Sequence, residues 1–162
     1  MLIEENSKEI KPKKVKESTT IGIDLGIKDF AVLSTGEKID NPKYLKTSIQ
    51  RLNVLQRRMS RKQKGSKNRA KARNAVSKLH EKISNQRNDF QHKLSSKIVN
   101  DNQVIISEDL MIANMVKNHK LAKAIQDVSW GEFTKQLKYK SEWNCKIYHK
   151  ISPWFASSQI WA

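Results

Sequence analysis

The chain has 162 residues, a length typical of a single domain, and 37% of them are hydrophobic, enough for a core. Its 32 Lys and Arg residues against 16 Asp and Glu give a formal net charge of +16. An excess of this size indicates a polyanionic partner, either nucleic acid or an anionic membrane surface. The single cysteine, Cys145, excludes an intramolecular disulfide and a cysteine-based zinc site within this chain. We expect Cys145 to lie in a strand as a small buried hydrophobe.

The positive charge is concentrated in one segment of the chain. Residues 43–98 carry 17 basic and 2 acidic side chains, whereas residues 1–42 carry 7 and 8, and residues 99–162 carry 8 and 6. This asymmetry predicts a nucleic-acid-binding element joined to a near-neutral scaffold. The sequence contains neither a run of about 18 apolar residues nor the apolar core of a signal peptide, so we expect a cytoplasmic protein without a transmembrane helix.

The first part of the chain predicts a polar arm followed by three antiparallel strands. Residues 1–18 are lysine-rich and have no hydrophobic periodicity. The run TTIGIDL at residues 19–25 is rich in β-branched residues and predicts a buried strand, with a second strand at residues 30–33. Thr35-Gly36 predicts a tight turn, which leads into a third strand at residues 37–40.

Residues 43–99 predict two long helices packed as a hairpin. Apolar residues recur at spacings of three and four, a pattern that favours coiled-coil-like packing, although Gln86 and Arg87 interrupt it. The segment from Lys64 to Asn68 supplies the small and polar residues of a turn. The apolar positions are Leu45, Ile49, Leu52, Leu55 and Met59, then Ala72, Val76, Leu79, Ile83, Phe90, Leu94 and Ile98.

The last third of the chain predicts a strand at residues 103–107, helices at residues 117–126 and 130–143, and a strand at residues 146–150. A strand that follows a long helical crossover usually pairs parallel with an earlier strand. The predicted elements are three antiparallel strands, a helical segment, a strand, helices and a final strand. This is the element order of the RNase H-like fold. We therefore predict an α/β fold with a mixed sheet and a basic helical hairpin inserted between the third and fourth strands.

Two carboxylates are candidates for the chemistry. Asp24 ends the first strand in the motif G-I-D-L-G, and Glu108 follows the fourth strand. If these strands are parallel neighbours, both carboxylates emerge at the same sheet edge, where open α/β sheets place their sites. Converging carboxylates suit Mg²⁺ or Mn²⁺, which orient water for phosphodiester hydrolysis. From the residues alone Asp109 competes with Glu108, and either carboxylate could merely cap a loop or a helix.

The motif G-I-D-L-G also occurs in actin-like and sugar-kinase ATPases, where it approaches the phosphates of ATP. Those proteins need further glycine-rich loops. The whole chain has five glycines, which leaves no room for a second such loop. The ATPase interpretation is therefore disfavoured.

The tip of the predicted hairpin is the candidate nucleic-acid-binding element. Its cations would neutralise phosphates and make binding salt-dependent, but such contacts position a duplex rather than specify its sequence. A merely solvated face is the alternative, and a membrane surface is disfavoured because the apolar stripe pairs the two helices. The candidate residues are Arg57, Arg58, Arg61, Lys62, Lys64, Lys67, Asn68, Arg69, Lys71 and Arg73, with Arg87 further along.

The remaining candidates are assigned to packing or to the surface. Trp130 could stack on a base, as in single-strand binders, but core packing is favoured, and Phe133 and Trp143 fit the same core role. The four histidines share no ligand spacing. They are His80, His92, His119 and His149.

Several stretches in order resemble the TnpB family, the accessory proteins encoded by insertion sequences. They are TIGIDLGIKDFAVLSTGEKIDNPKY, RRMSRKQKGSKNR, LHEKISNQRNDFQHKL, IISEDLMIANM and WGEFTKQLKYKSEW. The resemblance covers roughly residues 19–158. It implies a RuvC-like nuclease domain, an RNA-guided DNA endonuclease with DNA and guide RNA as partners, and three acidic residues that bind divalent metal. It implies that Asp24 is the first acid and Glu108 the second.

The chain also departs from the family pattern. Family members begin with a further RNA-holding region, here reduced to residues 1–18, and continue into a Cys-x-x-Cys zinc ribbon and a third catalytic aspartate, which this chain lacks. We therefore expect an arm at residues 1–18, an incomplete RuvC-like domain at residues 19–162, no Zn²⁺ site, and impaired or absent catalysis by this chain alone. The alternative is a non-catalytic nucleic-acid-binding relic.

Overall fold

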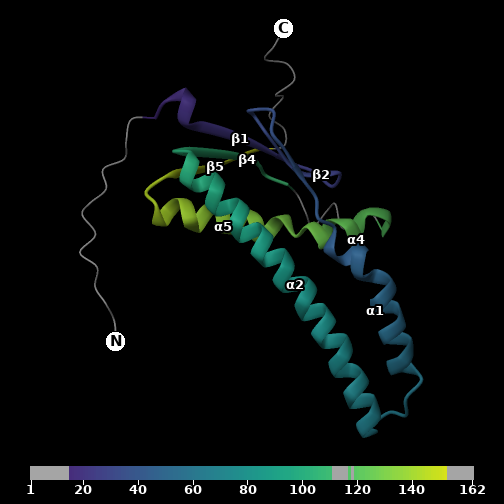
Figure 1. The fold of residues 1–162 in the computed structure, drawn as a ribbon. Helices are drawn as coiled ribbons and strands as arrows, with labels where there is room; N and C mark the ends of the chain where they lie inside the picture. The colour runs from purple at the N-terminus through teal and green to yellow at the C-terminus, as the bar shows by residue number, and fades with distance from the viewer. Residues whose placement is uncertain (1–14, 111–116, 118, 153–162) are drawn as a thin grey trace, which may run out of the picture.

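The computed structural model describes residues 15–110, 117 and 119–152, and most of the predicted arm and the segment after residue 152 lie outside this part of the chain. The described elements form one five-stranded sheet in the order β3-β2-β1-β4-β5 and a set of helices (Figure 1). The strands are β1 Thr20–Leu25, β2 Asp29–Leu33, β3 Lys38–Asp40, β4 Val104–Glu108 and β5 Ile147–Ile151. The helices are η1 Glu17–Thr19, α1 Tyr44–Ser60, α2 Lys67–Asp101, α4 His119–Val128 and α5 Trp130–Trp143.

The strand pairing confirms the predicted topology. β1 pairs antiparallel with β2, β2 pairs antiparallel with β3, and β1 pairs parallel with β4, which itself pairs parallel with β5. Each of the five strands begins and ends within one residue of its predicted bounds. The turn between β2 and β3 contains Gly36 at φ +86°, the left-handed conformation that the tight-turn prediction requires.

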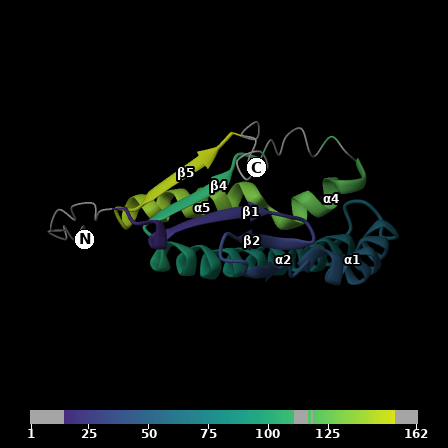
Figure 2. The ribbon, with the colours of Figure 1, turned by 90° about the horizontal axis from the view of Figure 1, so that it is seen from above.

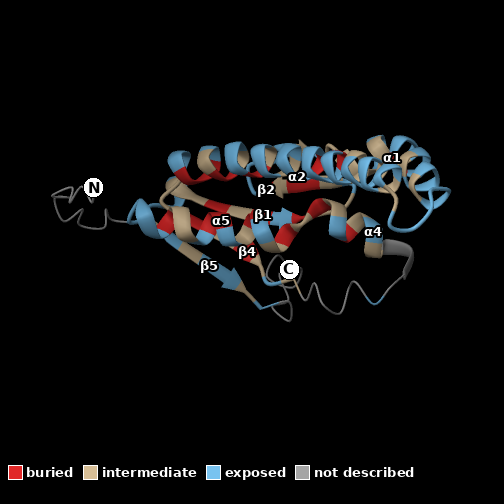
Figure 3. Ribbon diagram, turned by 90° about the horizontal axis from the view of Figure 1, so that it is seen from below, coloured by how far each residue is buried: buried red, intermediate tan, exposed pale blue. Residues whose placement is uncertain are grey.

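Helices α2 and α5 cover one face of the sheet, as the two perpendicular views show (Figures 1 and 2). Side chains alternate along β1, so that Ile21, Ile23 and Leu25 are buried against the helices while the residues between them are not. The rings of Phe30 and Phe133 meet edge to face with centroids 5.0 Å apart. The buried colour in Figure 3 follows this sheet–helix interface. The core therefore lies between the two layers.

Buried polar groups join α2 to α5. The Ser95 hydroxyl donates to Gln136 Oε1 at 3.2 Å, and Gln91 Nε2 donates to the carbonyl oxygen of Ser129, the N-cap residue of α5, at 3.2 Å. The Lys140 ammonium donates to the Ser95 hydroxyl at 2.8 Å, and burial lowers the pKa of this lysine. These bonds fix the register of the two helices, because shifting either one would leave buried donors and acceptors unpaired.

Helices α1 and α2 run antiparallel and project away from the sheet (Figure 1). A small core of Leu52, Leu79 and Ile83 lies between them. The turn lies at residues 61–66, which is earlier in the chain than the predicted residues 64–68. α2 already begins at Lys67, with Ser66 Oγ as its N-cap acceptor at 3.2 Å from a main-chain amide, so Lys67 and Asn68 belong to the first helical turn. No described helix is long and apolar enough to cross a membrane.

Two packing predictions are wrong. The core face of α5 is built by Trp130, Phe133 and Leu137, which confirms the core role of the first two. Trp143 is the last residue of the same helix and is 77% exposed, with its ring centroid 4.7 Å from that of Tyr139. Cys145 is exposed as well, because it lies in the turn before β5, at φ 51°, rather than in the strand.

Candidate metal site and nucleic-acid interface

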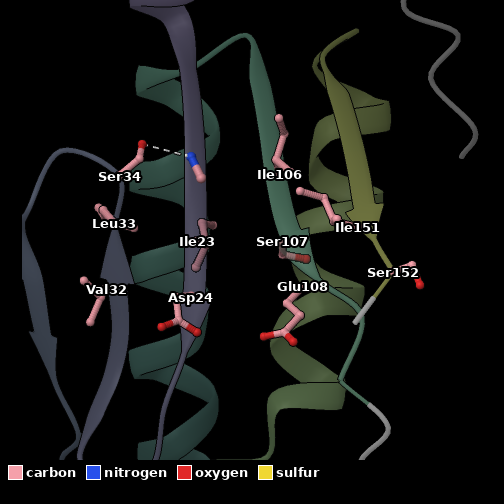
Figure 4. A pocket seen from close by; sticks show the side chains of 11 residues that line it. Ile23, Asp24, Val32, Leu33, Ser34, Ile106, Ser107, Glu108, Ile151 and Ser152 are labelled. Carbon is pink, nitrogen blue, oxygen red and sulfur yellow. Dashed lines mark hydrogen bonds between the residues drawn. The ribbon is translucent and has the colours of Figure 1, made fainter. Parts of the chain in front are cut away.

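Asp24 and Glu108 lie side by side at one end of the sheet. In the parallel pairing of β1 with β4, Ile23 is the partner of Ser107, so Asp24 and Glu108 occupy the next position on each strand. Residues at matched positions of neighbouring parallel strands point to the same face, on strands about 4.8 Å apart. Figure 4 shows both carboxylates directed into the same space. The prediction that the two carboxylates lie together at one end of the sheet is confirmed.

Alternation along β4 separates Glu108 from its competitor. Asp109 directly follows the strand, and its side chain points to the opposite face of the sheet from that of Glu108. On that face its carboxylate pairs with the Lys150 ammonium at 2.9 Å. Its main-chain amide donates to the carbonyl oxygen of Ile151 at 2.8 Å, which extends the β4–β5 ladder. Asp109 is therefore engaged in holding the strand end. Glu108, on the other face, is the carboxylate that accompanies Asp24.

The two carboxylates line a cavity of ≈ 630 Å³ formed by β1, β2, β4 and the end of β5. Its floor includes Gly22, whose amide donates to the Ser34 hydroxyl at 3.1 Å. The cavity lies on the face of the sheet away from α2 and α5, so it is open to a large ligand (Figure 4). This opening suits the phosphate of a polymer better than it suits a small enclosed substrate.

The donor set fits a hard divalent cation. Asp24 is exposed and Glu108 is half-buried, and neither forms an ion pair with any basic residue of the described chain. Two neighbouring carboxylates without a protein cation repel each other, and Mg²⁺ or Mn²⁺ prefers such oxygen ligands. Within residues 15–110, 117 and 119–152, no group of three or more His, Cys, Asp and Glu side chains gathers as a metal site. The described residues thus bring two carboxylates, Asp24 and Glu108, to one place on the sheet.

The predicted nucleic-acid-binding residues lie at the far end of the α1–α2 hairpin. The loop between the helices contains Gly65 at φ +81°, a conformation that favours glycine. Arg69 holds this loop, because its guanidinium donates to the carbonyl oxygens of Met59 at 3.4 Å and Lys62 at 3.0 Å. Arg69 and Arg73 border a shallow hollow of ≈ 220 Å³ at the start of α2. The hairpin tip therefore presents a dense group of cations on an ordered loop.

Arg87 differs from the other predicted nucleic-acid-binding residues. It lies 14 residues beyond Arg73 along α2, near the base of the hairpin, where its guanidinium pairs with Asp127 of α4 at 3.2 Å. Asp127 also accepts hydrogen bonds from the main-chain amide of Leu45 at 3.0 and 3.1 Å, through its two carboxylate oxygens. The guanidinium of Arg87 is thus tied into a contact that joins α2, α4 and the start of α1.

Sequence reasoning missed two residues that set the position of α1. Asp127 reaches the first turn of α1 from 82 residues further along the chain, a contact that no local pattern indicates. Asn41 donates to the carbonyl oxygen of Ile27 at 2.8 Å and accepts from the Lys43 amide at 3.1 Å. Its place before Pro42, directly ahead of a helix, was a usable signal for such a capping role. Together the two side chains fix the base of the hairpin against the sheet edge.

Comparison with known proteins assigns the chain to a family. The profile of the OrfB_IS605 family, described as "Probable transposase", matches residues 2–119. The chain belongs to this family of insertion-sequence proteins, and the resemblance to TnpB is confirmed.

Two relatives and one solved structure illustrate the similarity. A Streptomyces pristinaespiralis protein named "Putative RNA-guided DNA endonuclease" is 46% identical over 88% of this chain and 36% of its own length. "Putative RNA-guided DNA endonuclease InsQ" of Escherichia coli is 29% identical over 88% of this chain and 39% of its own length. The chain thus spans less than two fifths of either relative.

A cryo-EM structure of a Cas12f1–sgRNA–target DNA complex is similar in fold, with a TM-score of 0.55 and 18% identity over 87% of this chain and 30% of the other. At this level of identity the likeness concerns the fold alone, a mixed α/β sheet with helices.

Proposed function

We propose that this chain is the metal-binding, RuvC-like part of a transposon-encoded, RNA-guided DNA endonuclease that hydrolyses phosphodiester bonds. The observation that carries the proposal is the matched position of Asp24 and Glu108 on neighbouring parallel strands, on the open face of the sheet and without a protein cation. The names of the two relatives support DNA as the substrate and RNA as the guide. The chain covers only 36% and 39% of these relatives, so the activity of the complete protein is itself part of the proposal.

In this proposal Asp24 and Glu108 would hold Mg²⁺ or Mn²⁺, which activates water and stabilises developing charge on phosphate oxygens. The β1–β4 pairing holds the two carboxylates in register, so little reorganisation accompanies binding. The Gly22 amide donates to the Ser34 hydroxyl at 3.1 Å, which ties β1 to the residue after β2 beside the cavity. The α1–α2 hairpin, an insertion between β3 and β4, would supply the phosphate-binding cations.

We further propose that the chain by itself cuts DNA weakly or not at all. The described cavity offers two carboxylates, and an incompletely positioned water can cost about 10²-fold in rate. The second candidate function is a nucleic-acid-binding protein without catalysis. The density of cations on the hairpin favours it, because that surface does not depend on the carboxylate pair.

The test separates binding of metal from cleavage. We would measure thermal stabilisation by Mg²⁺ and Mn²⁺, then cleavage of single-stranded and double-stranded DNA, for the parent chain and for Asp24→Asn and Glu108→Gln. Asp109→Asn is the matched control, because it removes a neighbouring carboxylate from the other face. A cation at 100 times its dissociation constant stabilises the fold by about 2.7 kcal/mol.

We expect the stabilisation to disappear in Asp24→Asn and Glu108→Gln and to persist in Asp109→Asn. Any cleavage should follow the same pattern. Cation stabilisation that both variants retain would refute the metal site. Metal binding without cleavage would support the non-catalytic alternative for this chain.

A further inference from the structure

The open face of the sheet, which points away from α2 and α5, carries a row of side chains at the level of the carboxylate pair. Asp24 is the register partner of Val32, and Val32 is the partner of Lys38 on β3. On the other side, Glu108 is the partner of Ile151 on β5. Partners on neighbouring strands point to the same face, and Figure 4 shows Val32, Asp24 and Glu108 along this row. The row therefore runs from Lys38 across both carboxylates to the end of β5.

His149 lies on the same open face, diagonally beside Glu108. It is the register partner of Ile106 and precedes the partner of Glu108 by two residues. Its Cα is therefore about 8 Å from that of Glu108, given strands about 4.8 Å apart and a rise of about 3.3 Å per residue. The residue before it, Tyr148, packs against the core on the other face, whereas His149 is exposed. The imidazole is thus presented to a ligand on the open face.

Lys38 places a cation at the opposite end of the row. It is exposed and forms no ion pair with the acidic residues that the structure describes. The acidic residue before it, Glu37, pairs with Lys97 at 3.0 Å instead. The Cα of Lys38 lies two strands, or about 10 Å, from that of Asp24, and an extended lysine side chain covers much of this distance. Its ammonium is therefore available to an anion beside the carboxylate pair.

Charge on the open face restricts where an anionic strand can pass. Asp40 follows Lys38 by two residues, so it points to the same face, and it is exposed. Asp29 on β2 is its register partner. These two carboxylates repel phosphates, whereas Lys38 attracts them and His149 can donate a hydrogen bond to them. The favourable line across the sheet therefore runs from Lys38 to His149 and passes over the carboxylate pair.

We propose that Lys38 and His149 are substrate-positioning residues, which bind the phosphates on the two sides of the scissile one, so that the DNA strand crosses the sheet from β3 to β5. The inference rests on the nuclease function proposed above and assigns the path of its substrate. The ammonium of Lys38 neutralises one phosphate. The imidazole of His149 donates from a ring nitrogen whether or not it carries a charge. Neither residue belongs to the α1–α2 hairpin, so this path is separate from the hairpin's cations.

The occupant of the path is one strand of DNA rather than a duplex. The two anchors are about 20 Å apart across the sheet, a span of a few nucleotides. The side chains between them include Val32 and Ile106, and such apolar surface suits the bases and sugars that a single strand leaves uncovered. A duplex would present its phosphates and keep its bases stacked inside, so it would leave these side chains without a partner.

The first experiment measures binding by the full chain, with Ca²⁺ as the cation because it takes the same oxygen ligands. Fluorescence anisotropy gives the affinity for a short DNA strand and for the matching duplex. We expect Lys38→Ala/His149→Ala to weaken single-strand binding about tenfold and duplex binding less than about twofold, because the hairpin still holds the duplex. Both side chains are exposed, so the unfolding midpoint should stay that of the parent.

The matched control is Lys138→Ala/His92→Ala, which removes the same two groups from exposed positions of α5 and α2. It should change neither affinity by more than about twofold. An equal loss of single-strand binding in the control would overturn the proposal. So would an equal loss of single strand and duplex in Lys38→Ala/His149→Ala, because the two residues would then not select a strand on the open face.

The second experiment uses conservative variants to separate chemistry from shape. Lys38→Ala should lower the slope of log single-strand affinity against log salt by about 0.7, the value for one phosphate, whereas Lys38→Arg should keep the parent slope. His149→Gln keeps a side-chain N–H donor and should retain most of the affinity that His149→Ala loses. Equal slopes for Lys38→Ala and Lys38→Arg would show that the charge does not bind a phosphate, and the proposal would be wrong.

Failure of the strand path and failure of the nuclease function give different results. If Asp24→Asn and Glu108→Gln keep cation stabilisation while Lys38→Ala/His149→Ala loses single-strand binding, the nuclease function fails and the strand path stands. If the carboxylate variants lose cation stabilisation while Lys38→Ala/His149→Ala binds the strand as the parent does, the strand path alone is wrong.

Discussion

Replacing Asp127 with Ala should destabilise the protein through two effects at one place. The carboxylate accepts a hydrogen bond from the main-chain amide of Leu45, in the first turn of α1, through both of its oxygens and pairs with Arg87, and its side chain is only 9% exposed. Loss of a helix cap costs about 1 kcal/mol, and an unpaired, mostly buried guanidinium adds about 2 kcal/mol after allowance for its partial exposure. We therefore expect the free energy of unfolding to fall by about 3 kcal/mol, which lowers Tm by about 6–12 °C at this chain length.

The assay is urea denaturation and thermal unfolding of the parent, Asp127→Ala, Asp127→Asn, Arg87→Met and the double variant Asp127→Ala/Arg87→Met. Asp127→Asn keeps an acceptor for the α1 amide and should cost less than Asp127→Ala. The double variant should be more stable than the sum of the single effects predicts, because neither buried charge is then left without its partner. A decrease below about 1 kcal/mol for Asp127→Ala, or strict additivity in the double variant, would refute this reasoning.

Three further predictions concern the scaffold. Gly26→Ala should destabilise the β1–β2 turn by about 1–3 kcal/mol, because a Cβ there would lie 2.9 Å from a main-chain oxygen, whereas Gly22→Ala, with its nearest contact at 3.5 Å, should be tolerated in the same denaturation assay. Phe133→Ala should cost about 3–5 kcal/mol and Trp143→Ala less than about 0.5 kcal/mol, so equal costs would contradict the exposure of Trp143. Burial raises the pKa of Tyr148 above its usual 10.0, so this tyrosine stabilises the fold below pH 10 and loses that contribution as pH rises through its folded pKa. Between pH 9 and 11 the free energy of unfolding should therefore fall less steeply with pH in Tyr148→Phe than in the parent. Identical slopes in the two proteins would contradict this role of Tyr148.

Local patterns predicted the secondary structure well because each strand and helix carries its own periodicity. The β-branched run before Asp24 and the apolar run before Glu108 predicted the two central strands within one residue. The order of the elements then indicated which strands are neighbours, since a long crossover favours parallel pairing. The position of the carboxylate pair was therefore predictable, whereas its role in metal binding stays a prediction.

The sequence could not decide which residues at an element's end are buried. Trp143 and Cys145 are of types that are usually buried, yet both are exposed. Where α5 ends relative to the sheet is decided by contacts with distant residues, such as the bonds of Lys140 to α2. Hydrophobicity alone carries no information about such an end.

The amino-acid sequence by itself determined the family, the element order, the two carboxylates and the basic segment, because motifs, periodicity and charge are all local properties of the chain. The family resemblance already favoured Glu108 over Asp109, and the tertiary structure supplied the physical reason: the pleat of β4 directs the two side chains to opposite faces, and Asp109 pairs with Lys150. Only the tertiary structure showed that Arg87 is held by Asp127, 40 residues away. Such pairings arise when separate elements pack, and packing is a property of the whole fold.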